Sequence, residues 1–219
     1  DVYKRQITDN CFQYILTYIK PGMTERQIAD EIEEYYKKRT EGLSFETIVA
    51  SGENTSKPHA VPTDRKIQEN DIITIDLSPQ VGNIWGDYAR TIIVENGEVV
   101  DDIELIQNQE WKSGLQMEEK LHAELFRFVT KGTTFEELYY HMNEFIVENG
   151  FVNLDFMGNL GHSIVKSKGD RVYIEKENVM KLGDVKYFTF EPHIAFPDSK
   201  YGCKKENIYY FDEDVLVEL

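Results

Sequence analysis

Four carboxylates and one imidazole stand in segments that otherwise predict buried structure. Asp76 and Asp87 lie in apolar, β-branched segments on either side of a turn sequence, and Glu191 interrupts an aromatic segment. Glu206 opens another apolar segment, and His162 lies in a glycine-containing turn. Burying several carboxylates together is unfavourable unless cations compensate their charge. These five residues are therefore our candidate cation ligands.

This donor set predicts the chemistry of the site. Four carboxylates supply hard oxygen ligands and His162 supplies one nitrogen, a combination that suits Mn, Co, Fe or Zn and argues against a thiolate zinc site. Two divalent cations would balance the four carboxylates. Taken alone, each carboxylate could be an ordinary solvent-facing strand residue, and His162 could be a structural histidine. The order and spacing of all five favour a two-metal site.

A β-hairpin should position the two aspartates. The segments around Asp76 and Asp87 are rich in β-branched residues, and Gly82-Asn83 between them is typical of a turn. A turn centred on Val81-Gly82 predicts that Asp76 lies directly opposite Asp87, with Cβ atoms ~5 Å apart. A metal between the two carboxylates would explain why this repulsive pair is tolerated.

The remaining elements alternate between helices and strands. Residues 7–20, a helix beginning near Thr24, and residues 102–128 have apolar residues at helical spacing. Strands are predicted near residues 45–52, at 187–196 and over 204–219. We find no linker rich in Pro, Gly or Ser, so residues 7–219 are predicted to form one α+β domain.

The helix start near Thr24 recurs later in the chain. Gly22 and Thr24 align with Gly132 and Thr134, and both copies have the side chains of a capping box. Two unrelated capped amphipathic helices could also align this well. The alternative is an internal duplication, with two α+β halves related by a pseudo-two-fold axis and a site where they meet.

Composition limits the classes of function. The chain has 219 residues, 41% of them hydrophobic, which permits a sizeable core. A formal net charge of −16 argues against nucleic acid as a partner, and no apolar segment is long enough for a membrane span. The two cysteines favour a reducing, cytoplasmic location. Residues 1–6 resemble a translated sequencing-adapter scar, so we expect the natural N-terminus to differ.

The motifs resemble those of the pita-bread metallopeptidases, which include methionine aminopeptidases, Xaa-Pro aminopeptidases and prolidases. The likeness extends over nearly the whole chain from residue 7, and the segment from Gly42 to Ile67 resembles the proline-specific branch. It implies the duplicated pita-bread fold around an antiparallel sheet, a short peptide as substrate and hydrolysis of Xaa-Pro bonds. A homodimer is consistent with it. The proline-specific members usually carry a further N-terminal domain.

The resemblance also assigns roles to residues. It implies that Asp87, His162, Glu191 and Glu206 bind one metal, and that Asp76, Asp87 and Glu206 bind the other. The ions would polarise the scissile carbonyl and lower the pKa of a water molecule. Glu191 would act as the general base, and His59 would contact the substrate or the tetrahedral intermediate.

One family residue is missing. The family has a second histidine seven residues after the ligand histidine, where this chain has Gly169. His193 is our candidate replacement, because alternate residues of a strand share a face and Glu191 lies two residues away. Lys166 and Tyr173 are weaker candidates. Lys204 stands where many proline-specific members carry an arginine, which keeps the charge and loses the bidentate geometry.

Three other functions stay open at this point. A methionine aminopeptidase would share the five ligands but differ in the loop that carries His59. The altered segment after His162 is compatible with a metal-dependent non-peptidase, such as a lyase. A pure binding module would have lost ligands, and this chain retains all five.

Overall fold

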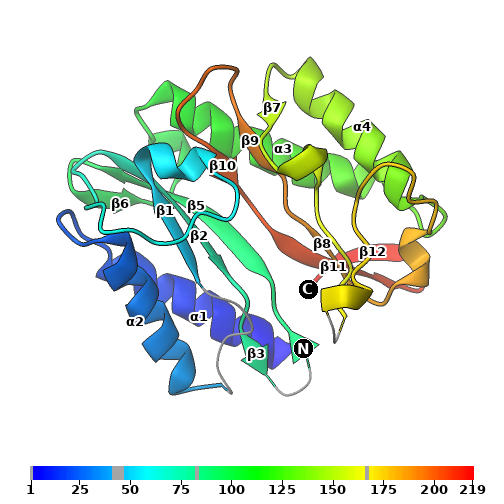
Figure 1. The fold of residues 1–219 in the computed structure, drawn as a ribbon, viewed down its shortest axis with the longest axis horizontal. Coiled ribbons are helices and arrows are strands. Elements are labelled where there is room, and N and C mark those ends of the chain that lie inside the picture. Colours follow the sequence, from blue (N-terminus) through cyan, green and yellow to red (C-terminus); the bar gives the residue numbers. More distant parts are fainter. Residues whose placement is uncertain (1, 41–46, 82–83, 166–167) are drawn as a thin grey trace.

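The computed structural model describes residues 2–40, 47–81, 84–165 and 168–219. Each half of the chain contributes a pair of helices and a set of antiparallel strands (Figure 1). The helices are α1 (Val2–Tyr18), α2 (Glu25–Lys37), α3 (Gln109–Phe128) and α4 (Phe135–Glu148). The blue pair and the green pair lie at opposite sides of the view, with strands between them. This arrangement confirms the predicted α+β class.

The first half is built on a four-stranded antiparallel sheet. Its strands, in spatial order, are β1 (Ile48–Ser51), β2 (Asp71–Leu77), β5 (Tyr88–Glu95) and β6 (Glu98–Val100). Apolar residues of β2 and β5, including Ile73 and Ile75, are fully buried against α1 and α2. The tip of the hairpin consists of the short pair β3 (Gln80–Val81) and β4 (Ile84–Trp85).

The second half has two three-stranded antiparallel sheets. One has the order β10 (Cys203–Lys204), β9 (His193–Ala195), β7 (Val152–Asn153), and the other β12 (Val215–Glu218), β11 (Asn207–Asp212), β8 (Phe188–Phe190). A second core cluster joins these strands to α3 and α4 through buried residues such as Leu121, Phe135 and Phe188. This second cluster also contains Ile72 and Ile93 of β2 and β5, so it joins the two halves.

The predicted duplication is visible in the backbone hydrogen bonds. The capping boxes of α2 and α4 are both formed, by Thr24 with Gln27 and by Thr134 with Glu137. Glu25 N donates to Arg65 O, and at the matching place Phe135 N donates to Met180 O. A shared pattern of helix entry supports two repeats of one unit.

The hairpin prediction was wrong in its register. Asp76 pairs with Ala89 and not with Asp87. The cause is the pairing of Val81 with Ile84 at the tip of the hairpin. Residues 82–83 between them lie outside the described residues. The register differs from the prediction by two residues, which preserves the side-chain alternation. Asp76 and Asp87 are therefore diagonal neighbours on one face.

Three predicted element boundaries also differ. The first helix begins at Val2 and includes residues 2–6. The helix predicted over 102–128 begins at Gln109, because the Asn108 side chain caps it by accepting from the backbone of Glu110 and Trp111. The strand predicted over 187–196 is interrupted at Glu191 and Pro192, since proline cannot donate to a ladder. Residues 41–46, part of the predicted strand near residue 45, lie outside the described residues.

Candidate metal centre

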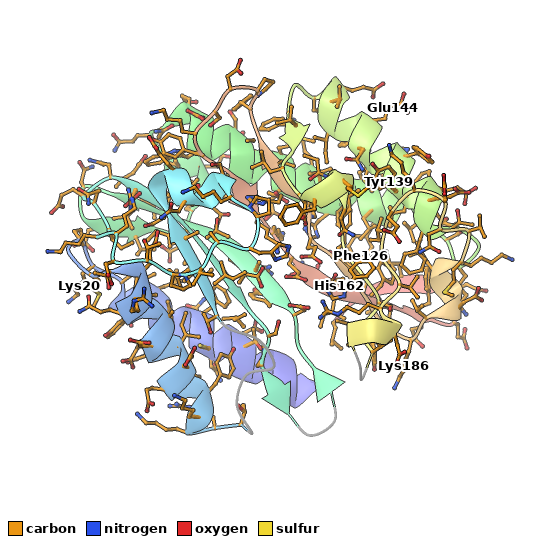
Figure 2. The ribbon with its side chains drawn as sticks, in the orientation of Figure 1. Lys20, Phe126, Tyr139, Glu144, His162 and Lys186 are labelled. Atoms are coloured by element: carbon orange, nitrogen blue, oxygen red, sulfur yellow. The ribbon has the colours of Figure 1, made fainter. Side chains whose placement is uncertain are left out.

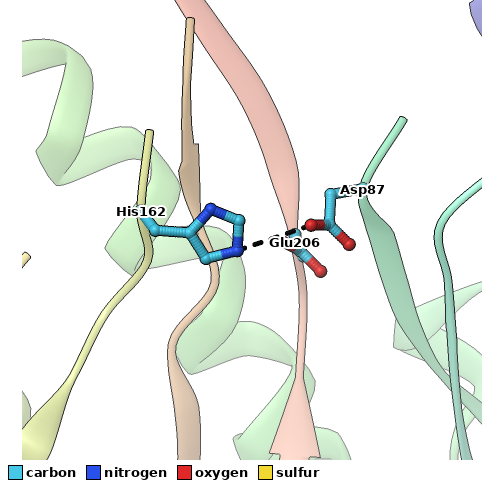
Figure 3. Close-up of side chains that lie close together, drawn as sticks. All are labelled: Asp87, His162 and Glu206. Atoms are coloured by element: carbon cyan, nitrogen blue, oxygen red, sulfur yellow. Dashed lines mark ion pairs between the residues drawn. The ribbon is translucent and has the colours of Figure 1, made fainter. Parts of the chain in front are cut away.

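The five candidate ligands meet at one place between the two halves. Asp87, His162 and Glu206 form one group whose ligand atoms all lie within 4.8 Å of one another, and Asp76, Glu191 and Glu206 form a second. Figure 3 shows that the first group comes from three separate segments, and Figure 2 places His162 near the middle of the molecule. Glu206 belongs to both groups, as expected for a bridging ligand.

The hairpin carries two ligands and is fixed to the strand that carries a third. Asp76 lies in β2 and Asp87 immediately precedes β5. Ala89 and Glu206 form an isolated β-bridge, in which Glu206 N donates to Ala89 O over 3.0 Å. Arg90 strengthens this junction by donating to the carbonyl of Glu206 over 2.7 Å. Arg90 thus joins the hairpin to the segment that carries Glu206 through a backbone oxygen.

His162 is held in the orientation of a metal ligand. Gly161 before it has φ +138°, and a Cβ at that position would lie 2.3 Å from the Thr189 carbonyl, so glycine is required. His162 Nδ1 lies 3.1 Å from Ser163 O and Nε2 lies 3.5 Å from Asp87 Oδ2. A proton on Nδ1 leaves the lone pair of Nε2 facing the carboxylates. Burial lowers the pKa of His162, which favours this neutral form.

The buried carboxylates are in an environment that a cation would stabilise. Burial, with the charges of Asp76 and Glu191, raises the pKa of Asp87 to about 7. Burial and the charge of Asp87 raise the pKa of Glu206 well above its ordinary value. Both carboxylate oxygens of Glu206 lack a hydrogen-bond partner among the described residues, and its side chain is 1% exposed. Orphaned, buried oxygens of this kind fit a divalent metal.

Two cationic side chains also reach the centre. Lys204 Nζ lies 2.6 Å from Asp76 Oδ2 and 2.9 Å from Glu191 Oε2. Burial opposes ionisation of Glu191, but Lys204 and His162 outweigh it and lower the pKa of this carboxyl to about 2. Arg171 Nη2 lies 3.7 Å from Asp87 Oδ2. The centre therefore contains positive charge of its own.

A cavity of about 790 Å³ opens in front of the ligands. Its lining includes His59, Asp155 and Phe156 beside Asp76, Asp87, His162 and Glu191. His59 Nε2 lies 3.8 Å from Asp155 Oδ1, and its ring stacks on Phe156. His59 has φ +54° and a half-exposed side chain. This position is compatible with the predicted contact between His59 and a substrate.

His193 does not line this cavity, but it lines a smaller one together with His59 and Asp76. Its Nε2 is 2.7 Å from Thr55 O, and the side chain is buried. Burial lowers the pKa of His193 to about 4, so the ring is neutral and donates to that carbonyl. The catalytic role of His193 stays a prediction. Tyr173 does line the cavity, whereas Lys166 lies outside the described residues.

Sequence reasoning missed three residues of the site. Ser78 donates to Asp87 Oδ1 over 2.7 Å, and the corrected hairpin register would have indicated it. Asp155 and Arg171 reach the cavity from irregular segments. Those segments have no periodicity from which side-chain direction could be predicted.

Comparisons with known proteins agree with this geometry. The sequence matches metallopeptidase family M24 over residues 4–213. The crystal structure of X-Pro aminopeptidase from Thermotoga maritima superposes with a TM-score of 0.82 at 28% identity, covering 97% of this chain and 57% of that one. Xaa-Pro dipeptidase from Pyrococcus furiosus is 28% identical over 88% of this chain and 52% of its own length.

A third relative is an uncharacterised peptidase, YqhT of Bacillus subtilis, which is 38% identical over 41% of this chain and 26% of its own length. The chain thus spans at most about half the length of these curated relatives. The arrangement of helices and antiparallel strands is the pita-bread fold, and the five candidate ligands lie together within it. The chain belongs to metallopeptidase family M24.

Proposed function

We propose that this peptidase hydrolyses the bond between an N-terminal residue and proline in short peptides, and that its centre holds two divalent ions at full loading. The observation that carries the proposal is the convergence of five predicted ligands on a buried, orphaned Glu206. The names of the Thermotoga and Pyrococcus relatives support the choice of Xaa-Pro bonds. Mn, Co, Zn and Fe are the candidate ions for these donors.

The position of each residue in the centre indicates its role in the proposed reaction. The metal would be held by Asp76, Asp87, His162, Glu191 and Glu206, and when bound it polarises a carbonyl and lowers the pKa of water. Glu191 is ionised, because its pKa is lowered to about 2, and its carboxylate can accept a proton beside the scissile bond. His59 faces the cavity from the opposite wall and would orient the peptide.

We also propose that Arg171 replaces the missing second histidine. Its guanidinium comes from the segment that follows His162 and lines the same cavity as the ligands. A fixed donor in a buried site can stabilise the negative charge that develops on a carbonyl oxygen. His193 is the replacement predicted from the sequence, but its Nε2 is already hydrogen-bonded to Thr55 O. The geometry therefore favours Arg171.

A substrate panel tests the proposal. Ala-Pro, Ala-Pro-Ala and Met-Ala-Ser would be incubated with the protein and Mn²⁺, Co²⁺, Zn²⁺ or a chelator. Metal-dependent cleavage of the two proline peptides alone supports the proposal. Preferred cleavage of Met-Ala-Ser would instead indicate a methionine aminopeptidase. Failure to cleave any peptide, with turnover of a compound from a small-molecule library, would indicate a non-peptidase such as a lyase.

Location and assembly are part of the same proposal. Both cysteines, Cys11 and Cys203, are free and buried, which is compatible with a reducing cytoplasm. Among the described residues, no helix is long and apolar enough to cross a membrane. We further propose a homodimer, which light scattering of the purified chain would test by giving twice the mass of 25.6 kDa.

A further inference from the structure

Asp155 is a carboxylate of the cavity that the proposed reaction does not use. It lines both the cavity in front of the ligands and the smaller one, its side chain is 8% exposed, and it belongs to neither metal group. Oδ1 accepts from the backbone of Phe156 over 2.6 Å, whereas Oδ2 has no hydrogen-bond partner among the described residues. The basic group beside it is His59, whose Nε2 lies 3.8 Å from Oδ1, beyond hydrogen-bond distance. Asp155 therefore presents an unused acceptor to a ligand in the cavity.

The segment that carries Asp155 is held by side-chain hydrogen bonds. Asn143 of α4 donates to Gly158 O over 3.0 Å, and Asn153 donates to the same oxygen over 3.1 Å. The Asn153 side-chain oxygen accepts from Asp155 N over 2.9 Å. Because the segment is already ordered, a ligand that binds the carboxylate does not have to order it.

An apolar wall lies beside the carboxylate. Val61, Phe156 and Met157 line the same cavity, and all three side chains are largely exposed. Lysine and arginine side chains commonly lay their methylene stems along apolar surface of this kind while the charged end reaches a polar partner. The wall therefore favours a long basic side chain over a small cation.

The charges of the cavity also favour a cationic ligand. At full loading, the two proposed divalent ions would balance the four ligand carboxylates. Asp155 and the exposed Glu175 then remain on the cavity lining, against the guanidinium of Arg171. Burial and the charge of Glu191 raise the pKa of Asp155, and a cation at this place would relieve that repulsion. The net charge of −16 attracts a basic peptide in the same direction.

The position of Asp155 distinguishes a basic side chain from the α-ammonium group of a peptide. The α-nitrogen is bonded to the carbon next to the scissile carbonyl, so it must stay close to the metal groups. Asp155 lies outside both groups, on the wall beside His59. The ammonium of a lysine is carried on a flexible four-carbon stem, which can extend from the ligands to this wall.

We propose that Asp155 binds the basic side chain of a lysine or arginine at the N-terminal position of the substrate, so that the protein prefers Lys-Pro and Arg-Pro peptides. Oδ2 accepts the hydrogen bond from the ammonium or guanidinium group, and Phe156 and Met157 cover the apolar stem. The inference rests on the proposed function and names the class of substrate for the same site.

Two peptides that differ in one charge test this inference. Lys-Pro-Ala and norleucyl-Pro-Ala share an apolar stem, but only the first has a side-chain ammonium. With Mn²⁺ present, we expect kcat/KM of the wild type to favour Lys-Pro-Ala by about 10- to 100-fold, the usual value of a hydrogen bond to a charged group. Asp155→Asn keeps an oxygen for Phe156 N and should lose this preference while retaining its activity on norleucyl-Pro-Ala. Asp214→Asn, which changes an exposed aspartate paired with Lys131, is the matched control and should keep the preference.

The same measurements can overturn the inference. An equal loss on both peptides in Asp155→Asn would show that Asp155 binds the α-ammonium or supports the fold, and a wild type without a preference would also refute the basic subsite.

If neither peptide is cleaved, the proposed function fails, and isothermal titration of both uncleaved peptides into the same Mn²⁺-loaded proteins tests the subsite separately. Tighter binding of Lys-Pro-Ala by the wild type but not by Asp155→Asn would support it. Equal binding of the two peptides, or binding of neither, would overturn it.

Discussion

The hydroxyl of Ser78 donates a hydrogen bond of 2.7 Å to Oδ1 of Asp87, and both groups are buried. The bond fixes the carboxylate so that Oδ2 faces Nε2 of His162. Side chains that orient a metal ligand in this way commonly contribute a factor of about 10 to 100 in metal affinity or activity. Ser78 is therefore a positioning residue for the centre.

Ser78→Ala is expected to weaken Mn²⁺ binding by about 10- to 100-fold, because Asp87 loses its orientation. Isothermal titration of the metal-free protein would measure the change. Ser56→Ala is the matched control, since its hydroxyl donates to the backbone of Glu53 in an exposed turn and should leave affinity unchanged. Unchanged affinity in Ser78→Ala would show that Asp87 is oriented by other contacts.

Arg171→Met should lower kcat by about 100- to 1000-fold on a proline peptide, the usual cost of losing a fixed donor to a developing oxyanion. His193→Gln should leave kcat close to the wild-type value, provided that thermal melting shows it is folded. Steady-state kinetics at saturating Mn²⁺ would compare the two. The reverse order of effects would restore His193 as the replacement for the missing histidine.

Gly161 tests the geometry around the ligand histidine. Gly161→Ala should destabilise the protein by about 3–5 kcal/mol, because the methyl group meets the Thr189 carbonyl and φ is strained. Gly150→Ala is the control, since Gly150 has φ +83° with nothing within 4 Å of a Cβ, and should cost only about 1–2 kcal/mol. Urea unfolding gives both values, and equal losses would contradict the predicted clash.

His122 should make stability depend on pH. Burial lowers its pKa to about 3, and its Nδ1 lies 2.6 Å from the Tyr209 hydroxyl. As the pH falls below about 6.5, His122 becomes protonated in the unfolded chain but stays neutral in the folded chain. The contribution of His122 to the free energy of unfolding is therefore fully present above pH 6.5 and is lost as the pH falls towards 3.

The comparison with His122→Gln isolates this effect. Below pH 6.5 the difference in free energy of unfolding between the wild type and His122→Gln should fall by up to about 1.4 kcal/mol per pH unit. Urea unfolding at pH 7.5, 6.0 and 5.0 would measure it. A difference between the two proteins that stays constant over this range would contradict the linkage.

The parts of the fold that the sequence predicted are those fixed by local interactions. The capping boxes at Thr24 and Thr134 depend on side chains three residues apart, and both are formed. The five candidate ligands were identified because charged residues in apolar segments require compensation wherever those segments lie. Their roles as ligands remain to be tested by the metal experiments.

Contacts between residues far apart in sequence determine the features of the fold and the site that the sequence did not predict. The pairing of Asp76 with Ala89 depends on how the hairpin turns, and a shift of two residues leaves the apolar pattern unchanged. The position of Lys204 in the centre depends on the pairing of β10 with β9 and on hydrogen bonds between its backbone and Thr91 Oγ1, a residue far away in sequence. Arg171 follows an irregular segment whose path cannot be read from periodicity.

The most direct test of the metal centre is anomalous diffraction from crystals of the protein soaked in Zn²⁺, with data collected at the zinc absorption edge. We predict a strong anomalous peak about 2.0–2.2 Å from carboxylate oxygens of Asp87 and Glu206 and from Nε2 of His162. A zinc-saturated crystal with anomalous peaks only elsewhere on the molecule would contradict the assignment of this cluster as the metal centre.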